Sequence, residues 1–567
     1  MFAIIVREVR DQFRLEKMLV VVGPAIFTAF LAILFLVNYF VPGTTFDARA
    51  SAFRTFFYEV LAVQFFLIIG IGALLAASAV SSRRDRQEMD FEIITPRSGV
   101  SIALGCMFGS NVFMYFLFAL TLPFSLLGFY LGNIETPRLV EAYVYLLGAV
   151  LFFQSLGLYV GALARTPTGA QIGTSLALLA SAAVVLLDNP SSDVFRHFAF
   201  FSPLFVFVKG MGAHQSFYMP FYGLNSPGGI NMSLVVFIMF LFGAFWLFKG
   251  ASRKLSDNAK PSFSRTGALL LYILALIIIA GFLWHKIPTA GPDAPGNQRA
   301  FYLPVLVYTA CVLAFAIPLY FVITPTRERY RLFLGKMLER PPSLSRVVFH
   351  SDSMPFAFAA LMHVSAFAVF MAIFIFFGKM GAHLGTAAGA GSPAFFFSAI
   401  VAFMLVFFVS VFYLAIIQLV QLSVKRYAKT LAVFIILVVV MMPFIADFAF
   451  SPAPSDLTQE QNPPQKSKLS FIYILNPVTV LSQTFPEVGL KVENPIYWFT
   501  SDRKLNQSEN SNPGLWQAVT SGVYLALTLI LWGVALIIRR RISTKVALQR
   551  GIEPPWTQSN SSSFSQD

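Results

Sequence analysis

Apolar runs of about 20 residues or more recur along the whole of this 567-residue chain. A bilayer core about 30 Å thick is crossed by roughly 20 helical residues, so each run is long enough to span a membrane. Hydrophobic residues make up 57% of the chain and charged residues only 12%, with a mean hydropathy of +0.71. This composition excludes a water-soluble globular protein of this size. The sequence therefore predicts an all-α polytopic membrane protein.

The apolar runs predict about twelve transmembrane helices in two six-helix halves. The first half covers residues 1–255, the second covers 256–540, and 541–567 is expected to be a disordered cytoplasmic tail. The outer loop 450–514 is rich in Pro, Ser, Asn and Gln, and is long enough to form a small cap. The predicted spans are 18–41, 57–80, 101–131, 138–164, 168–187, 231–249, 266–285, 301–324, 356–377, 394–422, 427–449 and 515–538.

The positions of the basic residues predict the orientation. If the N-terminus is cytoplasmic, most of the 41 Lys and Arg fall in cytoplasmic segments, whereas the acidic residues divide almost evenly between the two sides. We therefore expect a multi-pass protein of the cell membrane with both termini in the cytoplasm. The same placement accounts for the formal net charge of +14 without a nucleic-acid partner.

Motifs for catalysis or for binding a nucleotide or a metal are absent from the sequence. There is no GxxxxGK[ST] loop, so any ATPase must be a separate polypeptide, and there is no HExxH, CxxC or GxSxG. Cys106 and Cys311 fall at or within predicted spans, where they are expected to be small buried apolar residues. We expect no catalytic residue, no metal and no cofactor in this chain.

The predicted spans contain few ionisable residues but several neutral polar ones. Glu59, Glu141 and Asp447 lie near span ends, which weighs against a proton-coupled antiporter with a charge relay in the bilayer. The neutral polar residues are expected to form hydrogen bonds between helices, with a polar substrate path as the alternative. They are Gln64, Asn111, Gln154, Gln418 and Gln421.

Glycines spaced four residues apart predict close helix packing in the first half. Small residues one turn apart allow two helix backbones to approach each other. The pairs are Gly105 with Gly109, Gly157 with Gly161, and Gly169 with Gly173, all near the cytoplasmic ends of their predicted spans.

Segment 81–100 carries mixed charges between two apolar runs. Its charged residues recur at helical spacing beside apolar ones, and Pro96 then interrupts the pattern, which predicts a short helix at the membrane surface. A solvated connecting loop is the alternative. Segment 325–350 in the second half is a similar charged stretch between two spans. The charged residues of segment 81–100 are Arg83, Arg84, Asp85, Arg86, Glu88, Asp90, Glu92 and Arg97, and Pro96 and all of these except Asp85 and Arg97 are the expected contact residues.

Segment 81–100 resembles the corresponding segment of the permease subunits of type-two ABC exporters. The resemblance consists of acidic residues, an Ile-Ile pair, a Thr-Pro-Arg-Ser run and a glycine at the start of the next span. The sequence departs from the family pattern at Met89–Phe91, where a Gly-Thr pair is usual, and at Cys106, where Lys is usual. The matching residues are Glu88, Asp90, Glu92, Ile93, Ile94, Thr95, Pro96, Arg97, Ser98, Leu104 and Gly105.

The resemblance implies a transport channel driven by a cytoplasmic ABC ATPase that carries the ATP and Mg. Segment 81–100 would contact one copy of the ATPase and segment 325–350 a second copy. In the second segment the expected contact residues are Arg327, Glu328, Arg329 and Glu339. The alternatives are a secondary transporter and a membrane-embedded lipid-linked transferase.

Overall fold

A computed structural model of the chain gives two compact units, Met1–Phe263 and Ser264–Asp567. Every regular element in the described part of the chain is a helix. The structure describes residues 6, 19–40, 45–86, 98–164, 166–183, 232–256, 261–284, 298–339, 348–349, 353, 355–383, 393–424, 428, 431–436, 438–439 and 513–549.

Seven helices in the described residues are long and apolar enough to cross a membrane, or eight if one bent pair is counted as a span. The chain is thus a helical multi-pass membrane protein. Other predicted spans coincide with shorter described apolar helices, such as Ile26–Tyr39 and Arg265–Gly281. Most of the predicted span 427–449 lies outside the described residues, so the count of twelve stays a prediction.

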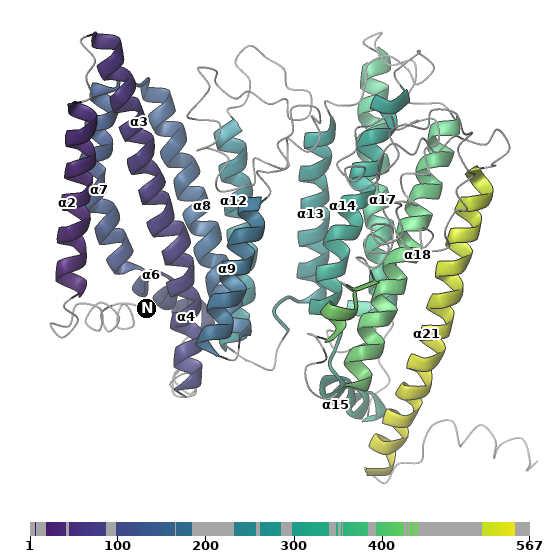
Figure 1. Ribbon diagram of the computed structural model, residues 1–567. Coiled ribbons are helices and arrows are strands. Elements are labelled where there is room, and N and C mark those ends of the chain that lie inside the picture. The colour runs from purple at the N-terminus through teal and green to yellow at the C-terminus, as the bar shows by residue number, and fades with distance from the viewer. Residues whose placement is uncertain are drawn as a thin grey trace, which may run out of the picture. The chain divides into compact units, whose positions relative to one another are not determined.

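The first unit contains two groups of helices (Figure 1). In one group, α2, α3 and α7 enclose Leu31, Phe53, Phe56 and Val60. In the other, α4, α6, α8 and α12 enclose a core that includes Cys106. The helices are α2 (Leu19–Tyr39), α3 (Phe46–Phe65), α4 (Gly72–Asp85), α6 (Gly99–Gly109), α7 (Val112–Leu131), α8 (Thr136–Leu163), α9 (Pro167–Ala183) and α12 (Met232–Ser256).

The predicted span 57–80 is part of a longer helix, Phe46–Asp85. It begins early because the Thr45 hydroxyl accepts a hydrogen bond from the Ala48 N–H, and Asp47 lies in the first turn. Between α3 and α4 it contains one π-helical segment, η1 (Phe66–Ile71). A π-helical segment shifts the hydrogen-bond ladder and is a frequent local irregularity at functional sites.

The predicted span 101–131 is broken at Ser110 and Asn111 into α6 and α7. The Asn111 Nδ2 donates a hydrogen bond of 2.8 Å to the Met107 carbonyl oxygen, one turn back. A side-chain amide that bonds to nearby backbone competes with the regular helix ladder. The break joins the two helix groups of the first unit, as does η1.

Close packing of α8 on α4 organises the second of these groups. A Cβ at Gly157 would overlap the Ala73 carbonyl oxygen, and a Cβ at Gly161 would overlap that of Ala77. The two backbones therefore lie in direct contact over about one helical turn. Gly105 and Gly109 are buried in α6. Added Cβ atoms at Gly169 and Gly173 would meet only side-chain atoms, of Thr166 and Val160, so no comparable backbone contact occurs there.

The second unit is held together by buried tyrosines. The Tyr308 hydroxyl donates to the Ala366 carbonyl oxygen at 3.1 Å, and the Tyr320 and Ser410 hydroxyls share a hydrogen bond of 2.7 Å. These bonds join α14 to α17 and α18. The helices are α13 (Arg265–Trp284), α14 (Gln298–Ile323), α15 (Arg327–Glu339), α17 (Phe356–His383), α18 (Pro393–Ser423) and α21 (Pro513–Gln549).

The last helix extends past the predicted boundary at residue 540. Since α21 continues to Gln549, the first part of the predicted tail 541–567 is helical. Leu529 and Ile530 are exposed, which places an apolar face of α21 where lipid would cover it.

The glycine contact predicts a marked difference between two Gly→Ala substitutions. Gly157→Ala should lower the Tm of the detergent-solubilised protein by several degrees, because α8 must move away from α4. Gly533→Ala is the control, since an added Cβ there meets nothing within 4 Å. Alanine is favoured over glycine in a helix by about 1 kcal/mol, so the control should be neutral or slightly stabilising. Equal Tm values for the two variants would contradict the packing.

Candidate functional site

Segment 81–100 begins inside the last turn of α4. Arg83 is 4% exposed, and its guanidinium donates from Nη1 to the Cys106 Sγ at 3.2 Å. The Arg84 Nη1 donates to the Ala164 carbonyl oxygen at 3.0 Å, at the C-terminal end of α8. Both arginines therefore tie the end of α4 to neighbouring helices, and Arg86 is the one with an exposed side chain. Glu88, Asp90, Glu92 and Pro96 lie outside the described residues.

The chain returns from this segment at a capped helix start. The Ser98 hydroxyl accepts a hydrogen bond from the Ser101 N–H at 3.2 Å and begins α6. Gly99 packs so closely on α12 that an added Cβ would overlap the Ser252 carbonyl oxygen. No glycine lies four residues from Gly99, so the spacing of glycines in the sequence does not indicate this contact. Both ends of the charged segment are thus fixed on the same helix group.

In the second unit, the charged segment 325–350 contains α15. A bend of 62° separates α15 from α14, at the position of Pro325. Its buried face contributes Tyr330 and Phe333 to a cluster with Leu422 of α18 and two residues of α21, Ile542 and Val546. Figure 1 shows α15 lying across the ends of these two helices.

A charge on α21 reinforces this contact. The Arg539 Nε donates to the Tyr330 hydroxyl at 3.0 Å, and its guanidinium lies 5.5 Å from the centre of the Tyr330 ring. Sequence reasoning missed this pair, since the two residues are far apart in the chain. In the sequence, Arg539 is the first of three consecutive arginines at the end of an apolar run, and nothing there marks it as a partner of Tyr330.

The opposite face of α15 is open. Glu328 and Leu332 are exposed, and Leu332 keeps 68% of its surface accessible. They are four residues apart, so they share one side of the helix. Arg327 and Arg329 are half-buried, and the side chain of Glu339 lies outside the described part. Of the predicted contact residues in this segment, Glu328 is therefore the most accessible.

Gln64 joins three helices in the interior of the first unit. Its Nε2 donates to the Thr121 hydroxyl at 2.8 Å and to the Ser125 hydroxyl at 2.7 Å, both on α7. Its Oε1 accepts from the Tyr143 hydroxyl of α8 at 3.1 Å. Gln64 is fully buried and uses both ends of its amide. This is the helix-to-helix bonding that its position in a predicted span indicated.

Gln154 makes a second polar contact next to η1. Its Oε1 accepts from the Tyr115 hydroxyl of α7 at 2.6 Å, and its Nε2 donates weakly to the Ile68 carbonyl oxygen at 3.5 Å. Ile68 is part of the π-helical segment, and Tyr115 lies just after the break at Asn111. Gln154 thus connects the two irregular points of the first unit through α8.

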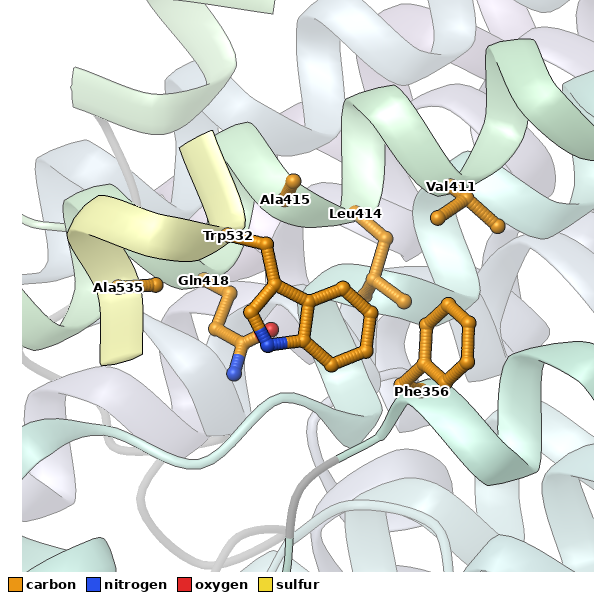
Figure 2. A pocket seen from close by; sticks show the side chains of 7 residues that line it. All are labelled: Phe356, Val411, Leu414, Ala415, Gln418, Trp532 and Ala535. Atoms are coloured by element: carbon orange, nitrogen blue, oxygen red, sulfur yellow. The ribbon is translucent and has the colours of Figure 1, made fainter. Parts of the chain in front are cut away.

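The second unit has a small pocket between α17, α18 and α21 (Figure 2). Its volume of about 10 Å³ leaves room for roughly one water. The Phe356 and Trp532 rings meet across it with their centres 4.3 Å apart. This pocket is too small for a transported solute. Among the described residues, no group of His, Cys, Asp and Glu is arranged to hold a metal.

The Gln64 contacts predict the cost of removing its amide. Gln64→Leu should lower the stability of the first unit by about 1–3 kcal/mol, because the buried Thr121 and Ser125 hydroxyls and the half-buried Tyr143 hydroxyl lose a partner. Asn38→Leu is the control, since in the described part of the chain the Asn38 amide donates to Leu34 of its own helix. Denaturation of both variants in detergent measures the difference, and an equal loss in the two would argue against a cross-helix role for Gln64.

Comparison of the chain with protein-family models, with curated proteins and with solved structures gives no match.

Proposed function

We propose that this chain is the membrane permease of an ABC exporter-like transporter. Separate cytoplasmic ABC ATPase subunits, two copies for the two units, bind ATP and Mg and drive the movement of a substrate across the bilayer. In this proposal both termini and the helix ends at Arg86 and α15 face the cytoplasm, as the positive-inside distribution of Lys and Arg indicates. The proposal rests on the resemblance of segment 81–100 and on the geometry of α15.

The observation that carries the proposal is the two-faced surface of α15. One face is fixed to α18 and α21 by Tyr330 and Phe333, while the other exposes Glu328 and Leu332. A short amphipathic helix with an acidic and an apolar group one turn apart suits a groove on a protein partner. A force applied to α15 would pass directly to two long helices, which is what coupling to an ATPase requires.

The first unit also has side-chain contacts that would transmit a force from the end of α4 to its neighbouring helices. Arg83 and Arg84 connect the end of α4 to α6 and to α8, so a push on this end moves these helices together. The movement would be taken up at η1 and at the break between α6 and α7, since these are the irregular points between the two helix groups. The group formed by α2, α3 and α7 would then tilt relative to the other.

The α15 surface predicts the effect of one charge on ATPase binding. Leu332→Lys should lower the ATP-hydrolysing activity that co-purifies with the chain at least several-fold, because the apolar contact is lost. Leu548→Lys is the control, because Leu548 is 67% exposed and Leu332 is 68% exposed. Leu548 lies in the last turn of α21. If neither variant reduced the associated activity, or if both reduced it equally, α15 would not be the specific contact.

Segment 81–100 predicts a second loss of binding. The triple variant Glu88→Ala, Asp90→Ala and Glu92→Ala should retain less ATPase while keeping the Tm of the wild-type chain, since the acidic groups are proposed to contact the partner. Glu135→Ala provides the control, because that side chain is 71% exposed in the connection between α7 and α8. Unchanged co-purification with the triple variant would refute this contact.

A further inference from the structure

Two side-chain amides of the first unit face the same small space above Gly72, the first residue of α4. A Cβ added at Gly72 would lie 3.1 Å from the Gln154 Nε2 and 3.3 Å from the Asn111 Oδ1. The space is next to η1 on one side and next to the break between α6 and α7 on the other. Both distances are shorter than ordinary van der Waals contact, so a side chain at position 72 would crowd the two amides.

The two amides have unused hydrogen-bonding capacity in this space. Asn111 is 0% exposed, and its Nδ2 donates to the Met107 carbonyl oxygen, but its Oδ1 has no hydrogen-bond partner in the described part of the chain. The Gln154 Nε2 donates only weakly, at 3.5 Å, to the Ile68 carbonyl oxygen. A buried amide oxygen without a donor is unfavourable, and native proteins rarely leave one so.

We propose that the space above Gly72 is a binding site for one hydroxyl group. The hydroxyl would donate its hydrogen to the Asn111 Oδ1 and accept one from the Gln154 Nε2. A carboxylate or a phosphate dianion has no hydrogen to offer the Asn111 oxygen, and an ammonium group has no lone pair for the Gln154 N–H. A hydroxyl oxygen can both donate and accept a hydrogen bond. The hydroxyl can belong to a water or to an alcohol group of a larger solute.

This inference does not depend on the proposed transport function. It depends on the directions of two neutral amides and on the absence of a side chain at position 72.

The test compares two substitutions at Gly72 that add the same Cβ. Gly72→Ala should lower the Tm of the detergent-solubilised full chain by a few degrees, since it displaces the hydroxyl and supplies none. Gly72→Ser should recover most of that loss, because its own Oγ takes the place of the bound group. Equal Tm values for the two variants would overturn the proposal.

A density map of the wild-type chain at a resolution that shows waters gives a test without any variant. The proposal predicts a peak within hydrogen-bonding distance of both the Asn111 Oδ1 and the Gln154 Nε2. An isolated peak identifies the hydroxyl as a water, and a peak continuous with a larger molecule identifies it as an alcohol group of a bound solute. An empty space, or a direct bond between the two amides, would overturn the proposal.

Discussion

The backbone contact between α8 and α4 is the interaction on which the first unit depends. In a bilayer, apolar surface gives little drive for helices to associate, so close approach and hydrogen bonds decide which helices pair. Gly157 and Gly161 bring the backbone of α8 onto that of α4. That contact places Gln154 of α8 beside η1 and Ala164 within reach of Arg84. The charged end of α4 and the polar interior are thus parts of one packed group.

Neutral polar side chains also join helices in both units. Gln64 and Gln154 hold helices of the first unit together, and Tyr308 and Tyr320 hold those of the second. None of these groups carries a charge, so burying them costs far less than burying an ion would.

The sequence predicted the helices whose ends are marked by composition. The span expected at 138–164 is Thr136–Leu163, with Pro137 at its start. It did not place the break at Ser110 and Asn111, because the one proline of the run 101–131, Pro123, lies inside α7 and not at the break. Arg83 was expected in a surface segment because of its charge, yet it is buried, since its partner Cys106 comes from the returning helix. Such a contact between separate segments leaves no local signal.

The central claim is that the open face of α15 meets an ATP-hydrolysing partner, and a site-specific crosslink tests it most directly. A photoreactive amino acid introduced in place of Leu332 should, in intact cells, attach to a polypeptide with a phosphate-binding GxxxxGK[ST] loop. The same amino acid in place of Leu529, which is exposed on the apolar face of α21, should not attach to that polypeptide. Crosslinks from position 332 to lipid alone, or to proteins without such a loop, would contradict the account.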